Sequence, residues 1–409
     1  MAATLSCVRG GFDLGATTLW AEDGTVFVQG AYEHGLSAFI TPYVGYLHLV
    51  PRLIAAVSTQ LPLAAQAAAM ALAAALVQGL VAGVAYVAVR AQRSAIWPAL
   101  FVAATVAMVP VGVEVIRAVA NLQWFLLYGA IIGQLWTPRR RFGWFVTGAV
   151  LVATTTGSPF GFVPAALAIA RWVVQRRRAT FAVAAAGLLG VGAQLPPMAQ
   201  STRQLSSGLH PDALTAGFLR RVVADGVLGV GRYVPGTLST SIIPGAVLTL
   251  LVCGLVALLV RHRGLDQALV PALLVAAAGA TFVIPVTLTS LACIDPFSGG
   301  RYFVAPALMW LTAVVLLVTE ALDGRVPSRR AGQSPAGLVA AVLLGASVVG
   351  LVTSFHPVTT YGREQVPPWT TAVDQTAKLC AGRSGDALVS VPIAPPGWAV
   401  TLTCGEVDQ

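Results

Sequence analysis

Ten apolar segments, each about 16 to 26 residues long, dominate this chain and limit what it can fold into. A helix needs ~20 residues to cross the hydrocarbon core of a membrane, so each segment has roughly the length of one transmembrane helix. Because that core offers no water to backbone amides, segments of this length are expected to be helices. They lie at 64–89, 95–112, 121–136, 142–157, 159–174, 179–197, 241–260, 267–290, 303–320 and 336–354.

The composition agrees with a chain folded mostly in lipid. Mean hydropathy is +0.78, and 56% of the residues are apolar while only 10% are charged, which lies outside the range of soluble domains. We therefore predict an all-α integral membrane protein with about ten transmembrane helices. The segments between 121 and 174 are short and closely spaced, so one of them could be re-entrant, which would reverse the sidedness of every later loop.

Arginines occupy every second loop between these segments. Under the positive-inside rule those loops face the cytoplasm, and ten spans then leave both chain ends outside. The formal net charge of +9 is thus mostly a topology signal, and it needs no nucleic-acid partner to explain it. The arginines concerned are Arg90, Arg93, Arg139, Arg140, Arg141, Arg171, Arg176, Arg177, Arg178, Arg261, Arg263, Arg325, Arg329 and Arg330.

An outside N-terminus requires a means of export. Residues 1–19 contain Arg9 and Asp13 and lack the apolar core of a signal peptide. We expect either a further helix ahead of residue 1 or a first helix that inserts with its N-terminal end outward.

The apolar segments divide the chain into three parts. Residues 1–63 are expected to hold an extracytoplasmic acidic loop and an interfacial helix, residues 64–354 the transmembrane helices, and residues 355–409 a small extracytoplasmic domain. In this last part Cys380 and Cys404 are near in sequence and lie on the predicted outer, oxidising side, which predicts a disulfide between them.

Motifs for the common soluble chemistries are absent. No CxxC or HxxxH spacing suggests a metal site, and the five histidines are scattered along the chain. Phosphate-binding loops, dinucleotide-binding loops and serine-hydrolase elbows are also absent. We expect no metal site and no bound cofactor, with a divalent metal ion left open.

Charged and aromatic residues gather instead at the predicted outer ends of the helices. Glu22 and Asp23 are adjacent carboxylates beside Trp20, which could act as a general base and a neighbour that raises its pKa. A solvated Asp-Gly turn is the simpler interpretation of the same residues. The stretch 41–61, broken by prolines and glycine, indicates an interfacial helix that holds Tyr46, His48 and Arg52 near the headgroups.

Two further clusters lie at other predicted outer ends. Glu114, Arg117 and Asn121 are spaced to share one helical face, with Trp124 following them. They could line a wet cavity, or Glu114 and Arg117 could simply pair with each other. Arg301 and Tyr302 end a tight loop, where an arginine could bind a phosphate in a bidentate manner or merely extend its side chain to the headgroups.

The order of these motifs resembles that of bacterial multi-spanning glycosyltransferases of the GT-C superfamily. The resemblance covers roughly residues 18–306, and its motifs are Trp20-Ala-Glu-Asp-Gly24, Gly45-Tyr-Leu-His-Leu-Val-Pro-Arg52, Asn121-Leu-Gln-Trp124 and Gly300-Arg-Tyr-Phe303. It implies that Asp23 or Glu22 is the catalytic base, that the donor is a sugar on a polyprenyl phosphate, and that Arg301 contacts the lipid phosphate. The chain departs from this pattern by lacking a helix before the acidic loop and by carrying only a small tail.

The residues and the resemblance together predict a glycosyltransferase of the bacterial plasma membrane that acts on the extracytoplasmic face. It would transfer a hexosyl or pentosyl group from a lipid-linked donor to a cell-envelope glycan or lipid acceptor. Membrane lipids are expected partners and nucleic acids are not. The candidate donor- or acceptor-binding residues are Arg301, Tyr302, Arg52, His48, Tyr46, Glu114, Arg117, Asn121 and Trp124.

Two alternatives remain open. A flippase or transporter of lipid-linked glycans would be expected to show internal repeats and charged residues near the midplane. A polymerase or ligase of lipid-linked glycans would be expected to rely on an outer arginine and histidine.

Overall fold

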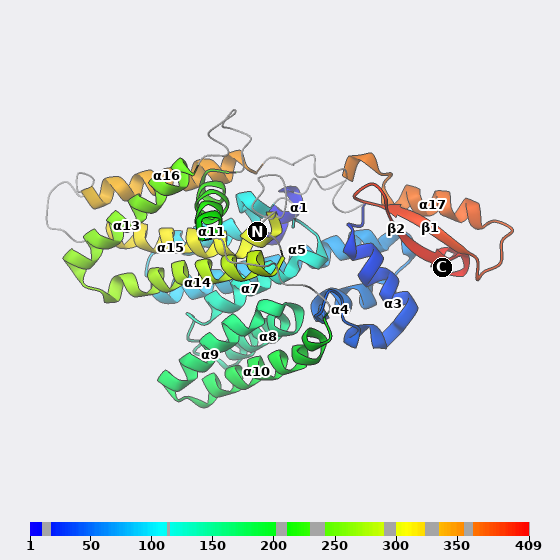
Figure 1. Ribbon diagram of the computed structural model, residues 1–409, viewed down its shortest axis with the longest axis horizontal. Helices are drawn as coiled ribbons and strands as arrows, with labels where there is room; N and C mark the ends of the chain where they lie inside the picture. Colours follow the sequence, from blue (N-terminus) through cyan, green and yellow to red (C-terminus); the bar gives the residue numbers. More distant parts are fainter. Residues whose placement is uncertain are drawn as a thin grey trace.

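The fold is a bundle of apolar helices with a small mixed domain at one end (Figure 1). The computed structural model describes residues 1–9, 18–112, 115–201, 211–229, 242–289, 300–323, 335–355 and 363–408. Arg325, Arg329 and Arg330, which contribute to the predicted topology, lie outside these residues.

Each of the ten predicted segments contains a helix, which confirms the all-α fold class. Within the described residues, six helical stretches are long and apolar enough to cross a membrane, namely Leu63–Gln92, Arg178–Ala199, Ile243–His262, Asp266–Thr287, Gly300–Leu322 and Pro335–Thr353. The helices are α5 (Gln66–Gln92), α6 (Trp97–Met108), α7 (Leu122–Gly133), α8 (Arg141–Gly157), α9 (Phe162–Gln175), α10 (Arg178–Ala199), α13 (Ile243–Arg263), α14 (Asp266–Thr289), α15 (Val304–Leu322) and α16 (Pro335–Thr353).

Two helices form the centre of the bundle. Every residue of α7 is buried, and α15 is buried along almost its whole length. The hydroxyls of Tyr128 on α7 and Thr312 on α15 lie 2.8 Å apart, so these helices share a hydrogen bond in the core. An all-apolar sequence without a polar stripe is typical of a helix that is surrounded by other helices.

The short helices α7, α8 and α9 all run between the two ends of the bundle. Trp124 and Phe160 line a cavity at one end, whereas Leu135, Arg140 and Arg171 lie together at the other. The re-entrant alternative for residues 121–174 stays a prediction, as does the membrane side of the arginine loops.

An inserted segment between α10 and α13 was not predicted. It comprises α11 (Pro211–Gly217), the π-helix η7 (Phe218–Ala224) and α12 (Asp225–Leu228), and it packs against α13, α15 and α16. The approach is close, because a Cβ on Gly245 would collide with the Leu219 carbonyl oxygen. The segment also buries an ion pair, with Arg221 Nη1 2.8 Å from Asp225 Oδ2.

A short N-terminal helix, α1 (Ala2–Arg9), was also not predicted. It packs against α5 and α6, and its Ser6 donates a hydrogen bond to the side chain of Gln78. The buried Arg9 guanidinium donates to the carbonyls of Ala107 (3.1 Å) and Val109 (2.8 Å). These carbonyls give the buried charge hydrogen-bond partners within the bundle.

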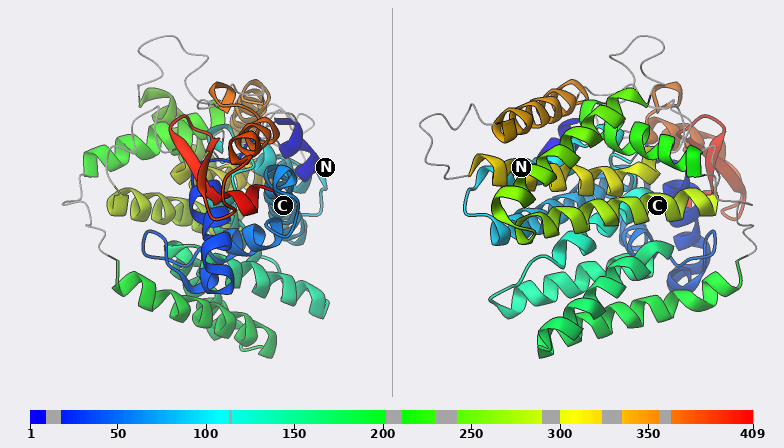
Figure 2. Two further views of the ribbon diagram at one scale, coloured as in Figure 1. Left: turned by 90° about the vertical axis from the view of Figure 1, so that its right-hand side faces the viewer. Right: turned by 60° about the vertical axis from the view of Figure 1, so that its left-hand side comes forward.

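Elements from both termini of the sequence gather at one end of the bundle, here called the hairpin end (Figures 1 and 2). They are η1 (Asp23–Val28), α3 (Gln29–His34), η2 (Gly35–Ile40), α4 (Leu49–Ser58), α17 (Trp369–Cys380), β1 (Leu388–Ile393), β2 (Trp398–Thr403) and α18 (Cys404–Val407). Helix α4 falls within the predicted interfacial stretch. The antiparallel strands pair Leu388 with Thr403 and Ile393 with Trp398.

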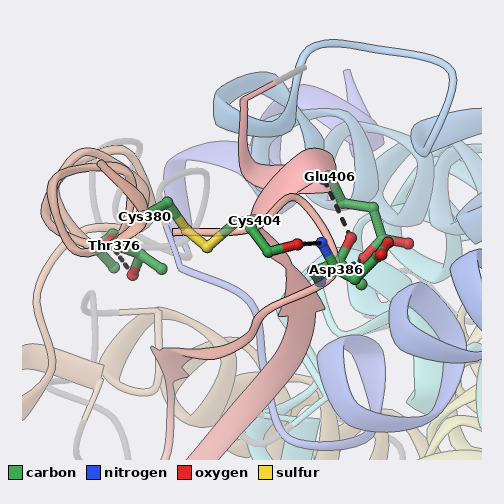
Figure 3. Close-up of a disulfide and its surroundings, with 8 residues drawn as sticks. Thr376, Cys380, Asp386, Cys404 and Glu406 are labelled. Carbon is green, nitrogen blue, oxygen red and sulfur yellow. Dashed lines mark hydrogen bonds between the residues drawn. A yellow bond between two sulfur atoms is a disulfide. The ribbon is translucent and has the colours of Figure 1, made fainter. Parts of the chain in front are cut away.

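The predicted disulfide between Cys380 and Cys404 is confirmed and joins the end of α17 to the start of α18, directly after β2 (Figure 3). The small domain that it closes is attached to the acidic loop through the backbone. The Ala21 amide donates to the Ala394 carbonyl (2.5 Å), and the Ala394 amide donates to the Leu19 carbonyl (3.1 Å). The C-terminal hairpin thus fixes the backbone next to Glu22 and Asp23.

The opposite end of the bundle, here called the arginine end, collects loops that the sequence predicted to share one side. Arg93, after α5, pairs with Glu320 near the end of α15. The Gln92 side chain donates to the Leu135 carbonyl (3.0 Å), and Arg171 Nη2 donates to the Trp136 carbonyl (2.7 Å). These contacts bring the α5–α6 loop, the α7–α8 loop and the end of α9 together.

Candidate functional site

The Asp23 carboxylate is buried at the hairpin end, against the turn η5 (Val119–Asn121) that precedes α7. The residue is 2% exposed, and its oxygens accept hydrogen bonds from the amides of Val119 (3.0 Å) and Ala120 (2.7 Å). Burial raises the pKa of Asp23 to about 7, while the two hydrogen bonds and the charge of Arg363 act in the opposite direction. The burial does not fit a solvated Asp-Gly turn.

Glu22, one residue earlier, lines a cavity of about 220 Å³ at the same end. Asp23 is not among the lining residues, although its partner Ala120 is. The complete lining is Glu22, Phe27, Tyr43, Val44, Tyr46, His48, Ala120, Asn121, Gln123, Trp124, Pro159, Phe160, Arg301 and Tyr302. The two adjacent carboxylates therefore have different surroundings, one buried among backbone donors and one beside an open space.

One wall of the cavity is a cluster of rings around His48. This residue is 3% exposed and has a positive φ of 55°, which places it in the left-handed region just before α4. Its ring centroid lies 3.9 Å from that of Tyr46 and 5.4 Å from that of Phe27. Burial, together with the charge of Arg52, lowers the pKa of His48 to about 3, so the imidazole is neutral at physiological pH.

The facing wall combines Trp124 with residues from two other segments. Its ring stacks against Phe160 at 5.5 Å and meets the edge of Tyr302 at 5.2 Å. The Arg301 guanidinium lies over the Tyr302 ring, with Cζ 5.3 Å from the centroid.

The pKa of Tyr43 is affected by both Glu22 and Arg301, so the acid and the cation lie near the same phenol. Burial raises the pKa of Tyr43, the charge of Glu22 raises it further, and the charge of Arg301 lowers it. The cavity thus offers a carboxylate and a guanidinium within electrostatic reach of one phenol, surrounded by aromatic faces. A concave lining of aromatic side chains, with polar and charged groups that can fix the orientation of a ligand, is typical of small-molecule sites.

Of the described candidates from the sequence, Arg52 and Arg117 do not line the cavity, whereas Asn121 does. Arg52 is buried behind it, where Nε donates to the Leu47 carbonyl (2.9 Å) and Cζ lies 5.7 Å from the Phe27 centroid. The expectation that Arg117 and Asn121 share a helical face is wrong, because Arg117 has a φ of 58° and Asn121 belongs to the separate turn η5. Glu114 lies outside the described residues.

Two contributing residues were missed by the sequence analysis. Phe160 follows a Ser-Pro turn at the start of α9, and that turn could have marked a helix end near the site. Arg363 is buried with Nη1 donating to the Thr18 carbonyl (3.3 Å) and Cζ 4.7 Å from the Trp20 centroid. No local signal in the sequence connects Arg363 with a loop more than 300 residues earlier.

A larger cavity, of about 840 Å³, lies at the arginine end. Its lining contains arginines and aromatic residues but no carboxylate, so it lacks a group able to accept a proton at neutral pH. For acid-base chemistry the smaller cavity at the hairpin end is the better candidate. In the described ranges, no group of three or more histidine, cysteine or acidic side chains is arranged to hold a metal ion.

The long apolar helices define an integral, multi-pass membrane protein. No family model and no curated protein matches the sequence. Among solved structures, the fold is similar to the crystal structure of the oligosaccharyltransferase of Archaeoglobus fulgidus in complex with zinc and sulfate, with a TM-score of 0.42 and 14% sequence identity. That alignment covers 91% of this chain and 56% of the archaeal chain, so the protein spans little more than half the length of that enzyme.

Proposed function

We propose that this protein is a membrane glycosyltransferase that moves one sugar from a polyprenyl-phosphate donor to a cell-envelope acceptor. The observation that carries the proposal is the pairing of Glu22 and Arg301 in one aromatic-lined cavity at the end of the helical bundle. A hydroxyl acceptor needs a base, and a departing phosphate needs a cation, so these residues supply complementary groups. The volume of about 220 Å³ suits a single sugar unit rather than an oligosaccharide.

Glu22 is the general base in this proposal. The acceptor oxygen attacks the anomeric carbon while its proton passes to the Glu22 carboxylate. The bond from that carbon to the phosphate oxygen breaks, and both of its electrons leave with the polyprenyl phosphate. Attack opposite to the leaving group inverts the configuration at the anomeric carbon. Arg301 would stabilise the charge that develops on the phosphate, since a guanidinium can hold two phosphate oxygens at once.

Asp23 has a positioning role. The sequence interpretation left the proton transfer to Asp23 or Glu22, but both oxygens of Asp23 accept hydrogen bonds from backbone amides and the residue lies outside the cavity lining. By fastening the first loop to the turn before α7, Asp23 sets the distance between Glu22 and the wall that contains Trp124. Its raised pKa follows from this buried position.

The neutral state of His48 argues against a mechanism that relies on a charged histidine. Burial lowers the pKa of His48 to about 3, so the ring can donate or accept a hydrogen bond but carries no charge near neutral pH. A polymerase or ligase that uses an outer arginine and histidine pair is therefore the weaker candidate.

We further propose that the hairpin end faces the extracytoplasmic side of the bacterial plasma membrane. The arginine loops gather at the opposite end, as the positive-inside rule requires of the cytoplasmic side. The Cys380–Cys404 disulfide supports the same orientation, because such bonds persist in oxidising compartments.

The experiment compares Glu22→Gln with Glu33→Gln, an exposed glutamate on α3 at the same end. A strain that lacks the protein should accumulate a polyprenyl-phosphate sugar, detected by mass spectrometry of lipid extracts. Wild type and Glu33→Gln should clear this lipid, whereas Glu22→Gln should clear it at least ~100-fold more slowly, because the amide cannot accept the proton.

Clearance by Glu22→Gln at the wild-type rate would remove the chemical basis of the proposal. Unfolding of the variant is checked by its thermal transition in detergent, which should match that of Glu33→Gln. If Asp23→Asn rather than Glu22→Gln abolishes clearance while both remain folded, Asp23 is the base and the role given to Glu22 is wrong.

A further inference from the structure

The cavity at the arginine end has the composition of an anion site. It is lined by Val87, Arg90, Ala91, Gln92, Leu135, Trp136, Thr137, Pro138, Arg139, Arg140, Phe142 and Gly143. Three of these residues are arginines and none is acidic. Arg139 and Arg140 are exposed, and neither forms a salt bridge with a carboxylate in the described part of the chain. Their charges are therefore available to a ligand.

The walls of this cavity are held in place by hydrogen bonds from three segments. Gln92 donates to the Leu135 carbonyl (3.0 Å), and Arg171 Nη2 donates to the Trp136 carbonyl (2.7 Å) and the Thr137 hydroxyl (3.2 Å). Arg90 Nη1 donates to the carbonyls that follow α5, including that of Arg93 at 2.7 Å, so Arg90 stabilises the rim. The cavity is thus preformed, which reduces the ordering cost of binding.

Close packing around Gly143 also shapes the cavity at the arginine end. A Cβ on Gly143 would lie 2.6 Å from Pro138 Cβ and 2.7 Å from a ring carbon of Trp136. The glycine therefore lets the 136–138 loop fold directly onto the start of α8, and the two neighbouring arginines project from the end of that loop.

Aromatic side chains around the cavity are typical of the level of lipid headgroups. Tryptophans concentrate at membrane interfaces, and Trp136, Trp144 and Trp172 all belong to this end of the bundle. The Arg171 guanidinium lies 4.9 Å from the Trp144 centroid. Phe142, which lines the cavity, and Phe145 on the same helix are 74% and 70% exposed, so exposed apolar surface lies beside the cavity.

We propose that this cavity binds the headgroup of an anionic phospholipid. Arg139 and Arg140 would hold the phosphate, with Phe142 and Phe145 against the acyl chains. Guanidinium groups match phosphate oxygens in a bidentate geometry, and basic pockets between transmembrane helices suit acidic headgroups. The site lies at the opposite end from the proposed glycosyl transfer, so its failure or success is independent of that function.

The test uses the full-length protein in detergent, titrated with a fluorescent phosphatidylglycerol and with the matching phosphatidylcholine. Arg139→Gln/Arg140→Gln removes the two charges at the cavity. Arg177→Gln/Arg178→Gln removes two exposed charges from the same end without touching the lining. The cavity variant should bind phosphatidylglycerol ~20-fold more weakly, or about 5-fold for each arginine, whereas the control variant should stay within about 2-fold of wild type.

Three outcomes would overturn the proposal. Equal losses in the two double variants would mean that general surface charge, not the cavity, attracts the lipid. Equal binding of phosphatidylcholine and phosphatidylglycerol by wild type would remove the headgroup from recognition. Competition by inorganic phosphate as strong as that by unlabelled phosphatidylglycerol would mean that the site takes free phosphate and not a lipid. Matching thermal transitions of all variants show that the fold is retained.

Discussion

At the hairpin end a set of ionisable side chains that includes Asp23, His48 and Arg363 is buried, whereas at the arginine end most cations are exposed. Asp23 binds two backbone amides, and Arg363 is buried between the Trp20 ring and a carbonyl. Arg139, Arg140, Arg177 and Arg178 face outward instead. Both ends have a cavity, but only the one at the hairpin end combines a carboxylate with a cation.

The two ends therefore differ in how they hold charge, since one buries charged groups with partners and the other exposes them to solvent. Burying a charge is costly unless partners compensate for it, so the buried groups at the hairpin end are evidence of a specific arrangement. Exposed arginines cost little and suit interactions with an anionic surface. The pKa values follow the same division, since burial raises the pKa of Asp23 and lowers that of His48.

The disulfide offers the largest expected effect. Cys380→Ala/Cys404→Ala opens a link with a sequence separation of 24 residues, which should destabilise the hairpin domain by ~3 kcal/mol. Hydrogen exchange should then speed up in β1, β2 and the acidic loop joined to them, while helices at the arginine end keep their protection. Cys253→Ala, at an exposed free cysteine on α13, is the control. Identical exchange in both variants would mean that the hairpin does not depend on the disulfide.

Arg301→Ala should weaken binding of the lipid-linked donor by ~2 kcal/mol, or about 30-fold, through loss of a charge-assisted contact with the phosphate. The donor is the lipid that accumulates in cells carrying Glu22→Gln. Rates of sugar transfer measured over a range of donor concentrations separate KM from kcat. Arg383→Ala removes an exposed arginine from the same end and should leave both constants unchanged. A loss of the same size in the two variants would assign the effect to overall surface charge.

Asp23→Asn should have the smallest effect, a loss of ~1 to 2 kcal/mol in stability because one backbone amide loses its acceptor. The loss should depend on pH. The folded-state pKa of Asp23, about 7, lies above its ordinary value of 3.8, so its contribution to stability is fully present below about 4 and is lost as pH rises through about 7.

The stability advantage of wild type over Asp23→Asn should therefore shrink between pH 5 and about pH 7 and then level off. Thermal unfolding of both proteins across this range measures the difference. His48 is present in both proteins, so its effect on stability cancels in the difference between them. Parallel pH profiles would contradict the raised pKa of Asp23.

Local sequence patterns were enough to predict the helices and the disulfide. The apolar segments became helices because a helix satisfies its backbone amides in lipid within a single segment, and Cys380 and Cys404 were close enough in sequence to pair. The segment at 211–228 and helix α1 escaped prediction because they are short and carry charges, which the bundle satisfies through Arg221 with Asp225 and through the partners of Arg9.

The sequence alone determined the fold class and which loops are expected to share a side. The length of each apolar segment and the positions of the arginines can be read from short stretches of the chain. Only the tertiary structure distinguished Glu22 from Asp23. Adjacent residues with similar side chains carry no local signal of which one faces a cavity, and that choice depends on the amides of Val119 and Ala120, some 96 residues away. Likewise, Arg301, Trp124 and Phe160 meet Glu22 only because α7, α9 and α15 begin at the same end of the bundle.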